Sequence, residues 1–294
     1  MKFKKSPINY TGGKYRLLPS LIPKFPKEIN TFVDLFCGGC NVGLNVKANQ
    51  YIFNDIQYPI IDMYTAFLKY DVDCVIEYID GVISKYDLTN SRDGYFKLRN
   101  EYNINNNPID LFILHAHAFN FMFRFNSKKE FNSACGVGTS NFNDSMRSNL
   151  IYFLNFIYTN NCKFKSINFT TFDYDILNVG DYVYCDPPYL ISKATYQDGK
   201  RGFDGWSEEY DSQLYSILDI LHDKGISFGL SNVIEHRGNK NNILIEWIEK
   251  SNYEVHYLNM SYSTANYRLK ERNEHKTIEV FVTNYKKPNL QVFY

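Results

Sequence analysis

The stretch Asp186-Pro187-Pro188-Tyr189 combines residue types that could activate an amino group. It follows the apolar run VYC at 183–185, which is typical of a strand. The amino group of adenine is a poor nucleophile because its lone pair is delocalised into the ring. If the Asp186 carboxylate and the Pro187 carbonyl accept its two hydrogen bonds, they stabilise the charge that develops as it attacks a methyl donor. Pro188 would stiffen the turn, and Tyr189 could stack on a base flipped out of a duplex. The alternative is a Pro-Pro turn in which Asp186 is only a cap.

Two further strand ends have residues that suit an adenosine-containing ligand. The predicted strand 31–36 runs into the glycine-rich stretch CGGCNVG (37–43), whose backbone could approach a ligand closely. Asp55 ends the predicted strand 51–55, where a carboxylate can accept hydrogen bonds from a ribose. The stretch matches neither the dinucleotide fingerprint nor the P-loop. A structural turn would explain the glycines about as well, and a helix dipole would explain Asp55.

Strand and helix patterns alternate on both sides of a long interruption. They predict one mainly parallel α/β sheet that closes with an antiparallel pair, and an insert from about 71 to 160. The insert combines helical patterns with polar, glycine-containing loops. The expected strands are 31–36, 51–55, 181–186, 226–231, 253–262 and 277–285, and the expected helices are 41–48, 59–70, 95–102, 108–126, 207–224 (with Ser207 as N-cap) and 241–250.

The charge is balanced overall but uneven along the chain. A formal net charge of zero over 294 residues argues against a protein that coats nucleic acid through bulk charge. Residues 1–30 nevertheless carry seven Lys or Arg against one Glu, and residues 261–287 carry six against three. We therefore expect local basic faces, although solvated surface lysines would give the same counts. Aromatic residues make up 17% of the chain, which favours a surface that binds flat groups.

The cysteines and the apolar runs indicate a protein of a reducing, cytoplasmic compartment. The six cysteines lack the spacing of a disulfide framework, and residues 1–10 lack the apolar region of a secretory signal. Cys37 and Cys40 form a single CxxC, whereas a zinc ribbon needs a second pair, so no metal site is expected. The longest apolar run, at 111–123, is too short to cross a membrane, and no membrane partner is expected.

The chain as a whole resembles the Dam-type adenine-specific DNA methyltransferases of the alpha group, and most of all their phage and restriction-modification members. The resemblance implies a Rossmann-like class I methyltransferase sheet, mostly parallel with an antiparallel last strand. It also implies an enzyme that transfers a methyl group from S-adenosyl-L-methionine to N6 of a flipped adenine in double-stranded DNA, with GATC as a candidate site. The stretches that carry it, in family order, are NYTGGK (9–14), FVDLFCGGCNVGLN (32–45), NDI (54–56), FRFNSKKEFN (123–132), DPPY (186–189) and SNV (231–233).

The resemblance also implies a division of the chain and a cofactor site. Residues 1–70 and 160–294 would form the catalytic domain, and residues 71–159 a mainly helical target-recognition subdomain with a β-hairpin. Tyr10 would offer a π-face to the sulfonium cation, while Lys14 could pair with a carboxylate. The implied cofactor-binding residues are Tyr10, Lys14, Phe36, Gly38, Asp55, Phe169 and Asp186, and the catalytic ones are Asp186, Pro187, Pro188 and Tyr189.

The expected recognition hairpin is FMFRFNSKKEFNSACG, residues 121–136. Arg124 would read a guanine edge, because its guanidinium bonds both O6 and N7. Lys128 and Lys129 would contact phosphates, and Asn126 completes the expected DNA-binding set. The family usually has Pro and an aromatic residue before the last Gly of this hairpin, where this chain has Ala134 and Cys135. This departure weakens the carry-over of a particular recognition sequence, and GATC stays one candidate.

Two other activities and several partners remain open from the sequence. Similar tetrapeptides serve methyltransferases of RNA and of cytosine amino groups, and a catalytically silent DNA-binding regulator is an alternative of another class. Cys185 precedes Asp186, and no Pro-Cys pair suits attack on a pyrimidine carbon. This favours direct transfer of the methyl group over a covalent enzyme intermediate. We expect a monomer or weak dimer that acts on the nucleoid of a prokaryotic or phage-infected cell, with a cognate restriction endonuclease as a candidate partner.

Overall fold

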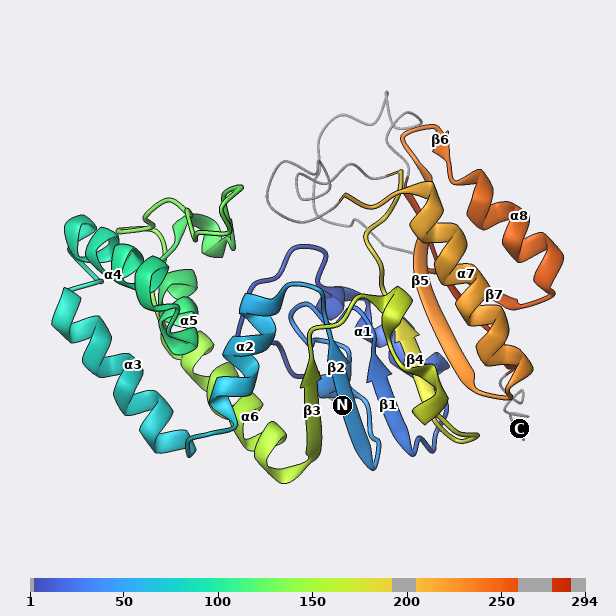
Figure 1. The fold of residues 1–294 in the computed structure, drawn as a ribbon, viewed down its shortest axis with the longest axis horizontal. Coiled ribbons are helices and arrows are strands. Elements are labelled where there is room, and N and C mark those ends of the chain that lie inside the picture. Colours follow the sequence, from blue (N-terminus) through green and yellow to red (C-terminus); the bar gives the residue numbers. More distant parts are fainter. Residues whose placement is uncertain (1–2, 192–204, 259–276, 287–294) are drawn as a thin grey trace, which may run out of the picture.

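The computed structural model describes residues 3–191, 205–258 and 277–286. Its centre is one sheet in the order β3-β2-β1-β4-β5-β8-β7, with β6 paired to β5 (Figure 1). The first five of these strands run parallel, and β8 is antiparallel to both of its neighbours. The expected Rossmann-like α/β sheet is therefore confirmed. The strands are β1 (Thr31–Asp34), β2 (Gln50–Asn54), β3 (Asn161–Lys165), β4 (Tyr182–Cys185), β5 (Ser227–His236), β6 (Asn239–Lys240), β7 (Glu254–Leu258) and β8 (Thr277–Thr283).

Alternate residues of the strands build two cores, one on each face of the sheet. Phe32 of β1 packs into one core, and its neighbour Val33 packs into the other. This period of two is what a strand buried on both faces requires. Helices α7 and α8 cover the second face, with Leu214 and Leu244 in its core. The helices are α1 (Leu18–Leu21), α2 (Tyr58–Phe67), α3 (Val72–Tyr86), α4 (Arg92–Asn105), α5 (Pro108–Ala116), α6 (Asp144–Thr159), α7 (Glu208–Asp223) and α8 (Asn242–Ser251).

The segment from α3 to α6 interrupts the alternation and gathers beyond the β3 end of the sheet (Figure 1). It contains four helices and a hairpin between α5 and α6. Helix α7 begins as expected, because the Ser207 side chain accepts a hydrogen bond from the Tyr210 backbone. The closing antiparallel pair is also confirmed as β7 and β8, although residues 259–262 of the expected strand lie outside the described residues.

Two expected helices are wrong. Residues 41–48 form only a 3₁₀ turn, Gly43–Asn45, after which Val46 is extended. A Cβ at Gly43 would lie 2.2 Å from the Phe53 ring, so this backbone is held close to β2 rather than coiled as a helix. The expected helix 108–126 ends at Ala116, because the rest of that apolar run belongs to the hairpin. Alternate apolar residues on a hairpin and a short buried helix give similar runs, so the pattern alone could not separate them.

Candidate active site

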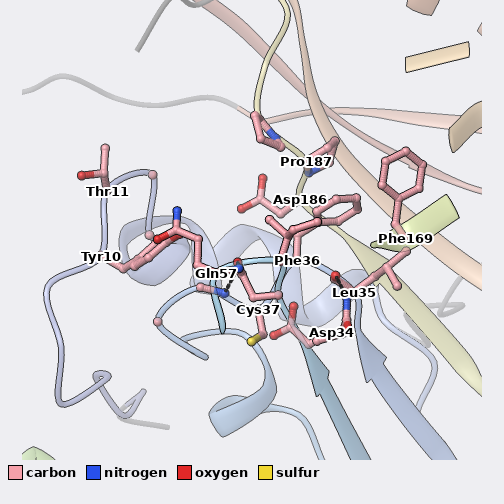
Figure 2. A pocket seen from close by; sticks show the side chains of 18 of the residues that line it. Tyr10, Thr11, Asp34, Leu35, Phe36, Cys37, Gln57, Phe169, Asp186 and Pro187 are labelled. Carbon is pink, nitrogen blue, oxygen red and sulfur yellow. Dashed lines mark hydrogen bonds between the residues drawn. The ribbon is translucent and has the colours of Figure 1, made fainter. Parts of the chain in front are cut away.

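A pocket of about 730 Å³ opens at the carboxyl edge of β1, β2 and β4. Its size is in the range of small-molecule sites. In Figure 2, Tyr10 and Thr11 lie on one side, Phe169 lies on the other, and Asp186 and Pro187 lie between them. The expected residues that line it are Tyr10, Lys14, Phe36, Gly38, Asp55, Phe169, Asp186, Pro187, Pro188 and Tyr189, together with Lys129 from the hairpin. The structure thus brings together residues that lie up to 179 positions apart in the chain.

Asp55 ties the loop after β1 to the start of α2. One carboxylate oxygen accepts a hydrogen bond from the Gly38 backbone at 3.0 Å, and the other accepts one from the Gln57 backbone at 2.9 Å. Burial raises the pKa of Asp55, and these two hydrogen bonds lower it. Asp55 therefore bonds the backbone of Gln57, the N-cap residue of α2, and it also lines the pocket, where a contact with a ribose stays a prediction. A carboxylate has about four acceptor positions, so two bonds leave capacity for a ligand hydroxyl.

Gly38 allows the backbone to pass close beneath Tyr10. Its φ is +44°, and a Cβ placed there would lie 2.6 Å and 2.7 Å from two carbons of the Tyr10 ring. The ring would have to move for any other residue to fit. The glycine therefore sets the position of the aromatic wall of the pocket.

Replacing Gly38 with Ala should weaken binding of the cofactor that the sequence resemblance implies. The new methyl group displaces the Tyr10 ring, so we expect the dissociation constant for S-adenosylmethionine, the implied cofactor, to rise about tenfold, the equivalent of 1.4 kcal/mol. Isothermal calorimetry measures it. The matched control is Gly180→Ala, which has a φ of +98° but no atom within 4 Å of its Cβ position. Equal affinities for both variants would contradict the steric role of Gly38.

Aromatic side chains form one end of the pocket. Phe36 lies 5.5 Å from Phe169 and 5.7 Å from Trp206, measured between ring centroids. Phe169 in turn lies 5.4 Å from Trp206, which also contacts Tyr210. Trp206 and Tyr210 were not expected from the sequence. They belong to the start of α7 and its preceding turn, and only the tertiary fold carries them to the pocket.

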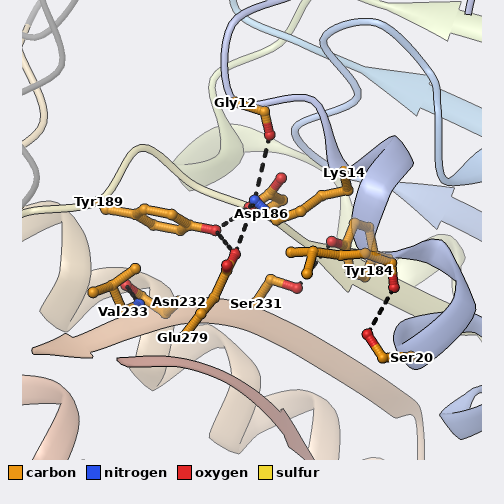
Figure 3. Close-up of polar contacts among 11 residues, drawn as sticks. Gly12, Lys14, Ser20, Tyr184, Asp186, Tyr189, Ser231, Asn232, Val233 and Glu279 are labelled. Atoms are coloured by element: carbon orange, nitrogen blue, oxygen red, sulfur yellow. Dashed lines mark hydrogen bonds and ion pairs between the residues drawn. The ribbon is translucent and has the colours of Figure 1, made fainter. Parts of the chain in front are cut away.

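Asp186 is held by an ion pair rather than exposed at a strand end. Lys14 Nζ lies 2.9 Å from Asp186 Oδ1 and 3.4 Å from Glu279 Oε1 (Figure 3). The Tyr189 hydroxyl lies 3.1 Å from the same Asp186 oxygen and 2.9 Å from the same Glu279 oxygen. Burial raises the pKa of Asp186, the positive charge of Lys14 lowers it, and the negative charge of Glu279 raises it. The carboxylate partner of Lys14 in this structure therefore comes from the protein itself.

Asp34 and Glu279 are pocket-region acids that the sequence reasoning missed. Asp34 ends β1 at 2% exposure and lines the pocket. Burial raises the pKa of Asp34 well above its usual range, and the negative charge of Asp186 raises it further. The strand-end argument used for Asp55 would also have found Asp34. No local signal marks Glu279, because it stands within β8 and reaches the site only through the pairing of β8 with β5.

The cysteines near the site are poorly suited to attack a substrate. Cys37, Cys40 and Cys185 are buried, and burial raises the pKa of each thiol. The thiolate is the reactive form, so these residues are held in the unreactive one. Within the described parts of the chain, no group of three or more His, Cys, Asp or Glu side chains could hold a metal ion.

The hairpin between α5 and α6 buries one face and exposes the other. Phe123, Phe125 and Phe131 are buried, whereas Arg124 is exposed. The two sides are joined by backbone hydrogen bonds, including Asn132 N to Arg124 O at 2.9 Å. Asn103 of α4 fastens the hairpin by bonding both backbone groups of Phe131. Arg124 therefore stands on the free face of a rigidly mounted hairpin.

The other three expected DNA-binding residues have different surroundings. The Asn126 side chain is used within the turn, where its oxygen accepts from the Lys128 and Glu130 backbones and its amide donates to the Glu130 carboxylate. Lys128 is exposed. Lys129 lines the pocket, with its ammonium 5.6 Å from the centre of the Tyr58 ring. A DNA contact by each of the three stays a prediction.

The sheet and the pocket at its carboxyl edge define a Rossmann-like α/β protein of the methyltransferase type. A family model described as D12 class N6 adenine-specific DNA methyltransferase matches residues 10–265. This chain belongs to that family, which confirms the resemblance inferred from the motifs.

Proteins similar to this chain include a modification methylase, a type II methyltransferase and a DNA adenine methylase. The modification methylase StsI of Streptococcus sanguinis is 41% identical over 285 residues, which is 97% of this chain and 43% of that protein. The type II methyltransferase M.FokI of Planomicrobium okeanokoites is 42% identical over 282 residues, 96% of this chain and 43% of that protein. The chain therefore spans less than half the length of both relatives. The DNA adenine methylase of Haemophilus influenzae is 30% identical over 243 residues, 79% of this chain and 80% of that protein.

No helix in the described residues is both long and apolar enough to span a bilayer.

Proposed function

We propose that this chain transfers a methyl group from S-adenosyl-L-methionine to N6 of an adenine flipped out of double-stranded DNA. The observation that carries the proposal is the placement of the Asp186-Pro187-Pro188-Tyr189 turn in a pocket shared with Tyr10, Gly38 and Asp55. The test is to incubate the chain with unmethylated duplex DNA and the donor, and to detect N6-methyladenine by mass spectrometry. Methylated cytosine or unmodified DNA would each contradict it.

The residues around the pocket fit an adenosine-containing methyl donor. The Gly38 backbone leaves space that a Cβ would fill, and the Tyr10 ring lies directly over it. Asp55 has unused acceptor capacity for ribose hydroxyls, and the Phe36 and Phe169 rings suit a flat base. When bound, the donor supplies an electrophilic methyl group on a sulfonium. The assignment of individual residues to the cofactor is part of this proposal.

The protein contributes orientation and charge stabilisation at the amino group. Asp186 and the Pro187 carbonyl accept its two hydrogen bonds, which turn its lone pair toward the methyl carbon. The ion pair with Lys14 fixes the Asp186 carboxylate for this task. Pro187 is buried, which helps the pocket to exclude water from the reacting atoms. Tyr189 gives the flipped base an aromatic surface, while its hydroxyl stays bound to the two carboxylates.

We propose that residues 71–159 recognise the DNA sequence, and that the hairpin is the part that contacts the bases. We expect Arg124→Ala to lower discrimination against a wrong base at one position by about 1–3 kcal/mol, because the paired hydrogen bonds to guanine are lost. Single-molecule sequencing of methylated DNA measures this as extra methylated sites. Lys128→Ala is the contrasting variant, since loss of a phosphate contact weakens binding to all sequences alike and reduces the salt dependence. An unchanged site pattern for Arg124→Ala would exclude its role in reading.

Membership of the family supports DNA as the partner of this chain. We propose double-stranded DNA as the substrate, with GATC among the candidate sites, and a cognate restriction endonuclease that recognises the same sequence. We propose action on the nucleoid as a monomer or weak dimer. Sedimentation of the chain with and without DNA tests the last point.

A further inference from the structure

Four polar atoms beside the pocket form a closed ring. Lys14 Nζ and the Tyr189 hydroxyl each bridge the same two oxygens, Asp186 Oδ1 and Glu279 Oε1, at distances from 2.9 to 3.4 Å (Figure 3). The ring is largely removed from water, since the Lys14, Asp186 and Glu279 side chains are 6%, 16% and 10% exposed. Its members come from three separate parts of the fold, since Asp186 and Tyr189 belong to the same turn. Glu279 has no task in the mechanism described so far.

Lys14 and Tyr189 together have too few hydrogens for the four contacts of the ring. In one contact, no hydrogen lies between the two oxygen atoms. The Lys14 ammonium has three hydrogens, and its three contacts are Asp186, Glu279 and the Gly12 carbonyl, the last at 3.4 Å. The Tyr189 hydroxyl has one hydrogen but faces two carboxylate oxygens. When both carboxylates are ionised, one oxygen faces a lone pair of the hydroxyl. One additional proton on either carboxyl group would complete the ring.

Methyl transfer to an amino group releases one proton. We propose that Glu279 is the residue that finally accepts it, through Tyr189, and this inference rests on the proposed function. The amino nitrogen gains a bond to the methyl carbon, whose bond to sulfur breaks with the electron pair staying on sulfur. The nitrogen is then positively charged, and one of its N–H bonds breaks to give a proton to the Asp186 carboxylate. Asp186 passes a proton to the Tyr189 hydroxyl oxygen, while Tyr189 gives its own proton to Glu279.

The surroundings favour movement of this proton toward Glu279. A proton held on Asp186 would weaken its pairing with Lys14, whereas transfer across Tyr189 restores the Asp186 carboxylate that the next substrate needs. Within the described part of the chain, the other ionisable groups that face Asp186 are Asp34 on β1 and Tyr184 and Cys185 on β4. Burial raises the pKa of the Tyr184 hydroxyl and of the Cys185 thiol well above their usual ranges, so neither is an acceptor.

The first test is Glu279→Gln, which keeps the shape of the side chain but cannot take up the proton. We expect the single-turnover rate at its pH plateau to fall about tenfold, less than the 10² to 10⁴ typical of a direct general base. Glu279 raises the pKa of Asp186, so its loss should move the acid side of the pH–rate profile to lower pH. The matched control is Glu254→Gln on β7, outside the pocket. It should leave the plateau rate and the acid side of the pH–rate profile unchanged.

The second test breaks the same path at its middle. Tyr189→Phe keeps the aromatic ring but removes the bridging hydroxyl, and the double variant with Glu279→Gln should have the plateau rate of the single variants. The wild-type chain should show a solvent deuterium isotope effect that both single variants reduce. If Glu279→Gln fails to fold, Tyr189→Phe supports or contradicts the relay through its isotope effect.

The outcomes separate the relay from the proposed function. The relay would be overturned if the rate losses multiply in the double variant, or if the acid side of the pH–rate profile is unchanged in Glu279→Gln. In either case N6-methyladenine is still formed, so the proposed function stands. A wild-type chain that methylates no adenine would overturn the proposed function, and the relay with it.

Discussion

Asp186→Asn should reduce methyl transfer by about 10³-fold, because the amino group loses the charged acceptor that stabilises its transition state. The amide keeps the size of the carboxylate, so the turn and the pocket should be preserved. The single-turnover rate with radiolabelled donor and unmethylated duplex DNA measures the loss. Binding of DNA, followed by fluorescence anisotropy, should change little, since Asp186 lies beside the base and not beside the phosphates in this proposal.

A matched control comes from an exposed ion pair elsewhere in the chain. Asp175 lies 2.6 Å from Lys224, at 86% exposure. Asp175→Asn removes the same charge from the same type of pair, and its rate should equal that of the wild-type chain. If Asp186→Asn retained the wild-type rate, the catalytic assignment of the whole turn would be wrong.

The pocket was predictable where the argument depended on strand ends. The carboxyl ends of parallel strands meet at one edge, so the motifs at Gly38, Asp55 and Asp186 had to converge once the alternation of strands and helices was recognised. The same reasoning extends to Asp34, which it would have found had it been applied to the last residue of β1. For site residues at strand ends, residue type and topology are therefore sufficient to predict the position.

Other features depend on side-chain geometry that no local pattern contains. Glu279 meets the site because β8 inserts between β5 and β7, and that strand order is set by long-range pairing. Lys14 was expected to pair with a carboxylate, and only the fold shows that Asp186 is such a partner. Asn126 makes three hydrogen bonds that shape the hairpin turn, which no local pattern indicated, and its DNA contact stays a prediction. A sequence gives the capacity of a side chain to bond, and the fold selects its partner.

An edge strand of the sheet was also hard to recognise from the sequence. The strand β3 has the sequence NCKFK, and each of its residues is exposed or half-buried. Lysines are common on such edges, where they discourage pairing with other chains, and they hide the apolar signal of a strand. The sequence predicted no strand over 161–165, although β3 extends the parallel sheet beyond β2.

Replacing Lys14 with Met should affect the rate, its pH dependence and the stability together. The variant leaves Asp186 and Glu279 as neighbouring buried carboxylates without their cation. Because Lys14 lowers the pKa of Asp186, its loss should raise that pKa and move the acid side of the pH–rate profile to higher pH, opposite to Glu279→Gln. We expect the rate at neutral pH to fall by at least about 10²-fold. Calorimetry with the methyl donor should also show weaker binding, as the resemblance implied.

The stability of this variant should depend on pH in a defined direction. Burial already raises the folded-state pKa of Asp186 above its unfolded value, so ionisation of Asp186 reduces stability as the pH rises between the two values. Without Lys14 the folded-state pKa is higher and the loss is larger, up to about 3–5 kcal/mol for a buried pair that loses one partner. Urea unfolding should therefore show a large deficit in the free energy of unfolding at neutral pH that shrinks in acid, where Asp186 is protonated. Lys224→Met, which breaks the exposed pair with Asp175, should show no such deficit. A pH-independent deficit in Lys14→Met would mean that the side chain acts by packing alone.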